Sequence, residues 1–159
     1  SSTDSLTGVV NRYTVLVVLE KQFSLAARRG GDIAVILCGL DGLKAVNDNH
    51  GREAGDEYIK TACAAILSSL RDSDTLGRLA GDAFLAVVPD CDEAGAAIID
   101  SRIAAALATV NAEATPFQVS IRRGVATYRE LGPAEPTPKA LLELADRRMN
   151  EARGHSRTA

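Results

Sequence analysis

Apolar residues along the chain follow two spacings, one typical of amphipathic helices and one typical of buried strands. Helical spacing predicts helices over residues 11–29, 56–71, 92–110 and 139–153. Short runs rich in apolar and β-branched residues predict strands over 33–40, 74–80, 84–88 and 117–128. Since helices and strands alternate, we expect one sheet whose faces are covered by helices.

The strand pattern also favours a particular arrangement of that sheet. Residues 33–40 are almost continuously apolar, which is typical of a strand that is covered on both faces. Gly81 and Asp82 separate two strand-like runs, which predicts an antiparallel hairpin. The expected class is α/β (α+β), with a central mixed five-stranded sheet flanked by helices in a ferredoxin-like arrangement. With no internal linker, residues 1–159 are expected to form a single domain.

Composition narrows the classes of partner. The net charge of −3 argues against DNA binding, whose affinity comes mainly from neutralising phosphates. No run of 18 or more apolar residues occurs, so we expect no direct membrane contact from this segment. Cys38, Cys63 and Cys91 are odd in number and lack C-x-x-C spacing, which favours small packing groups in a reducing cytoplasm.

Five segments resemble, in order, the motifs of one family. They are "DSLTGVVNR" (4–12), "LDGLKAVNDNHGREAGDEYI" (40–59), "RLAGDAF" (78–84), "VSIRRGVATY" (119–128) and "ADRRMNEARGHSR" (145–157). Together they resemble the GGDEF domain of the diguanylate cyclase family. The resemblance implies a nucleotide cyclase-like fold and an ancestral reaction in which two GTP molecules, held on two facing domains, condense to cyclic di-GMP.

The same resemblance implies a biological setting. We expect a cytoplasmic bacterial signalling domain that forms a homodimer or associates through its ligand. We also expect it to be excised from a larger multidomain protein that carries a neighbouring sensory or EAL domain. Because a fold does not establish an activity, the site residues have to be compared one by one.

Several positions depart from the family pattern. Of the family's two side-chain ligands for Mg²⁺, one position is Gly39, which has no side chain, and the other is Asp82. The signature Glu is Ala83, the first signature Gly is Ala80, and the usual Ser of the later strand is Arg122. We therefore expect no catalytic residues, no enzyme activity and no cofactor. Asp82 would be the only retained metal ligand, and Mg²⁺ binding would be weak or lost.

Part of the family's nucleotide pocket is retained. Asn47 and Asp56 match the pair that binds guanine, and Lys44, Arg153 and Arg157 match basic positions that meet phosphates. The alternative is an ordinary helix-start acid with solvated basic residues. Fewer acids also lead to the hypothesis that the pocket holds a nucleotide without a metal. The expected vestigial guanine-nucleotide site comprises Lys44, Asn47, Asp56, Gly81, Asp82, Arg122, Arg153 and Arg157.

A second candidate site lies upstream of the hairpin. Arg71 and Asp74 form an R-x-x-D motif at the position of the family's product-binding site, and Arg102 falls where the family adds a second Arg. Arginine can donate two parallel hydrogen bonds to guanine or clamp a phosphate. We expect the turn to project Arg71 and Asp74 outward as ligands of cyclic di-GMP. The alternative is a weak surface ion pair.

The leading expectation is thus an inactive GGDEF domain that acts as a cyclic di-GMP receptor through Arg71, Asp74 and Arg102. A second hypothesis moves cyclic di-GMP or GTP to the degenerate active-site face, without turnover. A third is an interaction domain that binds no nucleotide. Titration with cyclic di-GMP, compared with GTP, would separate them.

Overall fold

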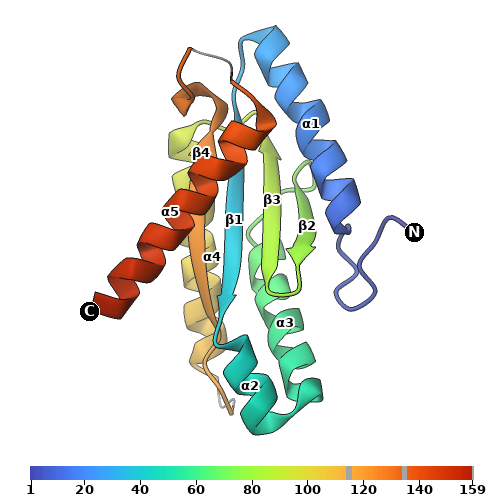
Figure 1. Cartoon of the computed structure of the whole chain (residues 1–159), viewed down its shortest axis with the longest axis vertical. Coiled ribbons are helices and arrows are strands. Elements are labelled where there is room, and N and C mark those ends of the chain that lie inside the picture. The colour runs from blue at the N-terminus through green and yellow to red at the C-terminus, as the bar shows by residue number, and fades with distance from the viewer. Residues whose placement is uncertain (114–115, 134–135, 159) are drawn as a thin grey trace.

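The computed structural model describes residues 1–113, 116–133 and 136–158 (Figure 1). The helices are α1 (Arg12–Arg29), α2 (Leu43–His50), α3 (Arg52–Leu67), α4 (Glu93–Asn111), the 3₁₀ turn η1 (Tyr128–Glu130) and α5 (Pro138–Thr158). The strands are β1 (Ile33–Asp41), β2 (Thr75–Ala80), β3 (Ala83–Pro89) and β4 (Ser120–Thr127).

The strands form one sheet in the order β2-β3-β1-β4, and each neighbouring pair is antiparallel. This order and the βαββαβ succession are those of a ferredoxin-like domain, so the predicted class is confirmed, while the sheet is antiparallel rather than mixed. The expected fifth strand is absent from the described part of the chain. The segment before α1 makes only isolated bridges, one of them a parallel bridge between Val10 and Gly77 of β2. Single bridges do not make a strand, so this segment adds none to the sheet.

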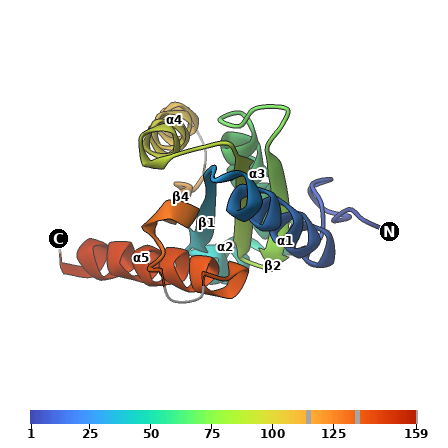
Figure 2. The same ribbon diagram turned by 90° about the horizontal axis from the view of Figure 1, so that it is seen from above.

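The sheet separates two hydrophobic cores. One core joins one face of the sheet to α3 and α4, and the other joins the opposite face to α1 and α5. Figure 2 shows the helices on the two sides of the strands. β1 is a central strand that pairs with β3 and β4, and helices cover both of its faces. Residues 33–40 are therefore buried, as the continuous apolar run predicts.

Helix ends follow local capping chemistry, with one region that the pattern did not predict. Asn11 caps α1 by accepting from the Thr14 N–H at 3.0 Å, and Gly30 ends that helix with φ 65°. The predicted helix over 56–71 actually runs from 52 to 67, and α2 precedes it. In α2 only Val46 is buried, so its apolar pattern is too weak to predict a helix.

None of the described helices is long and apolar enough to cross a membrane.

The two ends of the sheet carry different groups of loops (Figure 1). At one end, the β2–β3 turn lies near the end of β1 and the start of α2. At the other end are the loop before β2, the segment after β3 and the start of β1. The seven residues of β3 therefore separate two candidate sites by about 20 Å, at roughly 3.3 Å per residue.

The cysteines have the packing role that the sequence predicts. Cys38, Cys63 and Cys91 are all buried. Burial raises the pKa of the Cys38 thiol to about 12, so this thiol stays protonated near neutral pH.

Candidate nucleotide-binding sites

The turn between β2 and β3, residues 80–83, is held by Arg78. Its Nη2 donates to the Gly81 carbonyl at 2.9 Å, and its Nη1 lies 3.3 Å from both carboxylate oxygens of Asp4. Burial alone would raise the pKa of Asp4, but hydrogen bonds from Thr7 and the charge of Arg78 hold it below its usual value. The N-terminal motif thus ties the turn to the sheet rather than offering a free carboxylate.

Gly39 lies in a row of three residues that cross the sheet. It pairs with Ala83 on β3 and with Arg122 on β4, so all three positions point to the same face. The Arg122 guanidinium binds the Asp41 carboxylate, and only 14% of its side chain is exposed. Arg122, predicted to be part of the nucleotide site, therefore lies directly beside the position where the family has a metal ligand.

A buried tyrosine fixes the end of β1 at this site. The Tyr58 hydroxyl donates to the Asp41 carbonyl and accepts from the Ser120 N–H, the latter at 2.9 Å. Burial raises the pKa of Tyr58, which keeps the hydroxyl protonated. This contact joins α3 to β1 and β4, and it holds the backbone from which the Asp41 and Arg122 side chains project.

The two predicted guanine-binding residues come from neighbouring helices. Asn47 on α2 packs over Gly55 on α3, where a Cβ would lie 1.7 Å from the Asn47 Oδ1 atom. Asp56 follows Gly55 directly, so the fold brings the amide and the carboxylate to the same helix pair. Lys44 is almost fully exposed (93%) and lies 3.8 Å from Asp48. The side chains of Arg153 and Arg157 lie outside the described residues.

The donor set at this end of the sheet does not match the needs of a divalent cation. Mg²⁺ takes several hard oxygen ligands in near-octahedral geometry. Asp41 is bound by Arg122, Gly39 has no side chain, and Asp82 is exposed on the turn. Across the ranges that the structure describes, no three His, Cys, Asp or Glu side chains gather in a way that could hold a metal.

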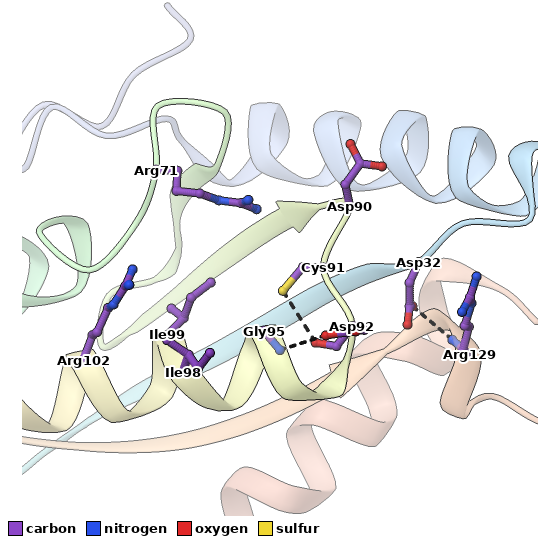
Figure 3. A pocket seen from close by; sticks show the side chains of 10 residues that line it. All are labelled: Asp32, Arg71, Asp90, Cys91, Asp92, Gly95, Ile98, Ile99, Arg102 and Arg129. Carbon is purple, nitrogen blue, oxygen red and sulfur yellow. Dashed lines mark hydrogen bonds between the residues drawn. The ribbon is translucent and has the colours of Figure 1, made fainter.

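The opposite end of the sheet holds a cavity of about 420 Å³, within the usual size of small-ligand sites. Arg71, from the loop before β2, and Arg102, from α4, both line it, together with Cys91, Ile98, Ile99 and Arg129. Figure 3 shows Arg102 rising from α4 toward the loop that carries Arg71. We call this cavity the arginine pocket. The structure therefore brings together the two arginines that the sequence predicts for this site.

Asp74 does not project outward, contrary to the prediction. Its side chain is 0% exposed, whereas that of Arg71 is 52% exposed. Asp74 instead accepts a hydrogen bond from the Arg71 N–H at 2.7 Å. Asp side chains commonly close such local turns with nearby backbone donors, which explains the inward orientation. Arg71 also lies beyond α3, which ends at Leu67, rather than closing that helix.

Sequence reasoning missed further residues of the arginine pocket. Arg129 lines it, but its guanidinium also donates to the Gly30 carbonyl at 2.7 Å. The carboxylates of two lining acids serve backbone donors: Asp92 accepts from the Gly95 N–H at 2.8 Å, and Asp32 accepts from the Ile33 N–H at 2.9 Å. The Asp at the start of α4 was a recognisable cap signal, whereas nothing in the sequence connected Arg129 to residues about a hundred positions earlier.

The sequence of the chain was compared with models of known protein families, and this comparison shows to which family the chain belongs. The family model described as "Diguanylate cyclase, GGDEF domain" matches residues 1–159, the whole chain. The chain belongs to the GGDEF family. The resemblance inferred from the five motifs is thereby confirmed.

Individual relatives agree with this assignment of the GGDEF domain. The diguanylate cyclase DgcS of Shewanella oneidensis is 33% identical over 154 residues, which cover 97% of this chain and 50% of DgcS. The solved GGDEF domain of TpbB (YfiN) from Pseudomonas aeruginosa is 31% identical, with a TM-score of 0.85 over 96% of this chain and 88% of that one. The chain thus spans half the length of DgcS.

A third comparison concerns a ligand complex. The GGDEF domain of DgcB from Caulobacter crescentus, solved with cyclic di-GMP, superposes with a TM-score of 0.86 over 98% of this chain and 91% of that chain. Only 19% of its residues are identical, so this likeness shows the common fold.

The comparisons correct the expectation that this GGDEF domain is not an enzyme. That expectation rested on Gly39, Ala80, Ala83 and Arg122 at family positions. The matched family is one of diguanylate cyclases, and DgcS, a diguanylate cyclase, is 33% identical over nearly the full chain. These findings point to an enzyme, and the prediction of an inactive domain is wrong. The replacements describe how the site differs, but they do not establish a loss of turnover.

Proposed function

We propose that this GGDEF domain works in cyclic di-GMP signalling and binds cyclic di-GMP in the arginine pocket. The observation that carries the proposal is the position of Arg71 and Arg102. They are 31 positions apart in the sequence and come from a loop and a helix, yet they line one cavity of about 420 Å³. Two arginines at a single concave site suit a ligand with two phosphates and two guanine bases.

The chemistry of the pocket supports this ligand class. A guanidinium can donate two parallel hydrogen bonds to O6 and N7 of guanine, or bind a phosphate through the same planar fork. Ile98 and Ile99 add apolar surface to the same wall. Beside the lining acids Asp32, Asp90 and Asp92, the cavity therefore offers guanidinium donors and apolar contact together, as small-ligand sites commonly do.

Asp74 acts in this proposal as a positioning residue. Its carboxylate holds the Arg71 backbone and lies 3.4 Å from the Arg71 Nη2 atom. The Arg71 Nη2 also donates to the Pro89 carbonyl at 3.1 Å, which directs the side chain across the end of β3. A half-exposed arginine that is anchored at both its backbone and its tip loses less side-chain freedom on binding.

The DgcB domain provides independent support. Its structure was solved in complex with cyclic di-GMP, and its fold matches this chain with a TM-score of 0.86. A fold of this kind can therefore carry that ligand.

A second proposal concerns GTP at the opposite end of the sheet. The contact of Asn47 with Gly55 places an amide beside Asp56, and a carboxylate can accept from both N1–H and N2–H₂ of guanine. We propose that GTP binds there and that the activity is the one named for DgcS, formation of cyclic di-GMP. Association of two copies of the domain would then bring two GTP molecules together.

Calorimetric titration with cyclic di-GMP tests the first proposal. We expect Arg71→Ala and Arg102→Ala each to weaken binding by about tenfold or more, since a hydrogen bond to a charged group contributes about 1.5–3 kcal/mol. Arg147→Ala is the matched control, because Arg147 is an exposed arginine on α5, which packs against the other face of the sheet. Equal affinity of wild type and Arg71→Ala would contradict the proposed pocket.

Separate measurements test the GTP proposal. We expect Asp56→Ala to weaken GTP binding by about tenfold or more and to leave cyclic di-GMP binding in the arginine pocket unchanged. Incubation of the purified domain with GTP, followed by chromatography, measures turnover directly. Product formation that is equal in wild type and in Asp56→Ala would contradict a role for Asp56 in holding GTP.

A further inference from the structure

The Arg122 guanidinium fills the space that a side chain at position 39 would occupy. A Cβ built on Gly39 would lie 2.8 Å from the Arg122 Cζ atom, 2.9 Å from Nη2 and 3.1 Å from Nε. Real Cβ atoms essentially never lie within 3.0 Å of another such heavy atom, so the first two of these distances are too short. A side chain at residue 39 and Arg122 in its present position therefore exclude each other.

Both oxygens of the carboxylate next to this position already have a partner. One oxygen of Asp41 is bound by the Arg122 Nη1, and the other accepts from the Ser120 hydroxyl at 3.2 Å. Ala83, the residue opposite Gly39 on β3, has no oxygen in its side chain. The residues present here do not fit the divalent cation that the family implies, since position 39 carries no oxygen, Asp41 is paired, and the exposed Asp82 alone remains as a carboxylate.

The guanidinium itself keeps donors available. A guanidinium carries five N–H groups, and the Nη1 of Arg122 donates a hydrogen bond to Asp41. The Nε of Arg122 has no hydrogen-bond partner within the described structure and is buried. A buried unpaired N–H is costly, so a neighbouring acceptor that draws the guanidinium into a better position would be favoured.

The chain just after Asp41 is also suited to an anion. Gly42, with φ 74°, leads into α2, whose N-cap has no side-chain hydrogen bond and whose first turn has no acid. Backbone N–H groups at such a helix start remain free to donate. This feature supports the charge of Arg122, which lies on the strand paired with the end of β1.

We propose that Arg122 takes the place of the divalent cation in this GGDEF domain and binds the phosphates of GTP directly. Asp41 orients the guanidinium, and Gly39 gives it room. Binding of GTP at this face is consequently independent of Mg²⁺. The inference rests on the proposed binding of GTP beside Asn47 and Asp56, and it adds the group that counters the phosphate charge.

Calorimetry with GTP, in EDTA and in Mg²⁺, is the first test. For wild type we expect dissociation constants that agree within about threefold in the two conditions. Arg122→Ala should weaken binding in EDTA by about tenfold or more, and Arg122→Lys should recover part of the loss, since a charge-assisted hydrogen bond is lost and then partly restored. Thermal unfolding of each variant shows whether it is folded at the temperature of the titration.

The double variant Gly39→Asp/Arg122→Ser provides a gain-of-function test that does not depend on losing affinity. Removing Arg122 opens the space for a side chain at position 39 and frees the Asp41 oxygen that Arg122 binds. We expect GTP binding by this variant to become dependent on Mg²⁺, with at least a tenfold loss in EDTA. Gly39→Asp alone should gain much less of this dependence, because the Arg122 guanidinium can shift and pair with the new carboxylate.

The outcomes separate this inference from the proposed function. If wild type binds GTP in Mg²⁺ and loses it in EDTA, the role of Arg122 is overturned while the GTP site stands. If Arg122→Ala binds GTP in EDTA as tightly as wild type, the inference is also overturned. If wild type binds GTP in neither condition, the proposed GTP site fails together with it.

Discussion

Asp74 holds the backbone of Arg71 through a hydrogen bond of 2.7 Å from the Arg71 N–H to the Asp74 Oδ2 atom. The carboxylate is 0% exposed, and the arginine that it holds is 52% exposed. Of the two motif residues, therefore, one is available to a ligand and the other is not. In the proposed site, the R-x-x-D motif would therefore supply one ligand-binding group and its support, rather than two ligand-binding groups.

This division of roles predicts different effects for two substitutions of Asp74. Asp74→Ala removes the acceptor of the Arg71 N–H, and we expect cyclic di-GMP binding to weaken by about tenfold. Asp74→Asn keeps a carbonyl oxygen that can accept the same bond, so it should lose much less. Calorimetry on both variants measures the difference. If the two substitutions weaken binding equally, the carboxylate charge matters for the ligand and the supporting role is contradicted.

Close packing of β4 against α5 leads to a prediction about stability. A Cβ on Gly124 would lie 1.8 Å from the Ala145 carbonyl oxygen and 2.6 Å from the Met149 nitrogen, both backbone atoms of α5. We expect Gly124→Ala to lower the free energy of unfolding by about 1–3 kcal/mol, as overpacking does. Urea denaturation provides the measurement. Gly132→Ala is the control, because its Cβ would meet nothing within 4 Å, and it should change stability by less than about 0.5 kcal/mol.

The fold was predictable where burial is strong and periodic. The continuous apolar run in β1 and the capped α1 and α4 were read correctly, since each depends on local spacing and end residues. Helix α2 was missed because only Val46 is buried and its N-cap makes no side-chain bond. This helix is stabilised by packing against α3, and the periodicity of a sequence does not show which other helix a segment will contact.

The candidate sites were predictable only in part, for similar reasons. Motif spacing indicated Arg71 and Arg102, because both positions follow the family register. The orientation of Asp74 was not predictable, since its side chain can either point into solvent or accept a hydrogen bond from a nearby backbone N–H. The contact between Arg122 and Gly39 depends on the register of β1 against β4. A one-residue shift of that register would place Arg122 on the other face of the sheet.

The pair of Glu130 and Arg148 predicts how stability depends on pH. Arg148 donates two hydrogen bonds to Glu130, at 2.5 Å and 3.0 Å, and this holds the pKa of Glu130 below its ordinary value of 4.5. A carboxyl with a lowered folded-state pKa adds stability above its unfolded pKa and loses it as pH falls through the folded value. We therefore expect wild type to lose stability as pH falls from about 5 into the acid range.

Glu130→Gln isolates this contribution. The variant should be less stable than wild type at pH 7, and the difference should shrink as pH falls below about 4.5. Melting temperatures of the two proteins, measured across pH 3 to 7 in steps of about half a unit, provide the comparison. A difference that stays constant over the whole range would show that the charge of Glu130 does not contribute.

The three buried thiols predict an order of chemical labelling. Cys38 is 0% exposed with a pKa of about 12, Cys63 is 4% exposed and Cys91, which lines the arginine pocket, is 6% exposed. Because the thiolate is the reactive form, all three should react slowly in the folded protein, and Cys91 should react first. Timed alkylation followed by peptide mass spectrometry measures each rate. Saturating cyclic di-GMP should slow the labelling of Cys91 by several-fold and leave that of Cys38 unchanged. Equal protection of both thiols would indicate general stabilisation, whereas no protection of Cys91 would contradict binding in this pocket.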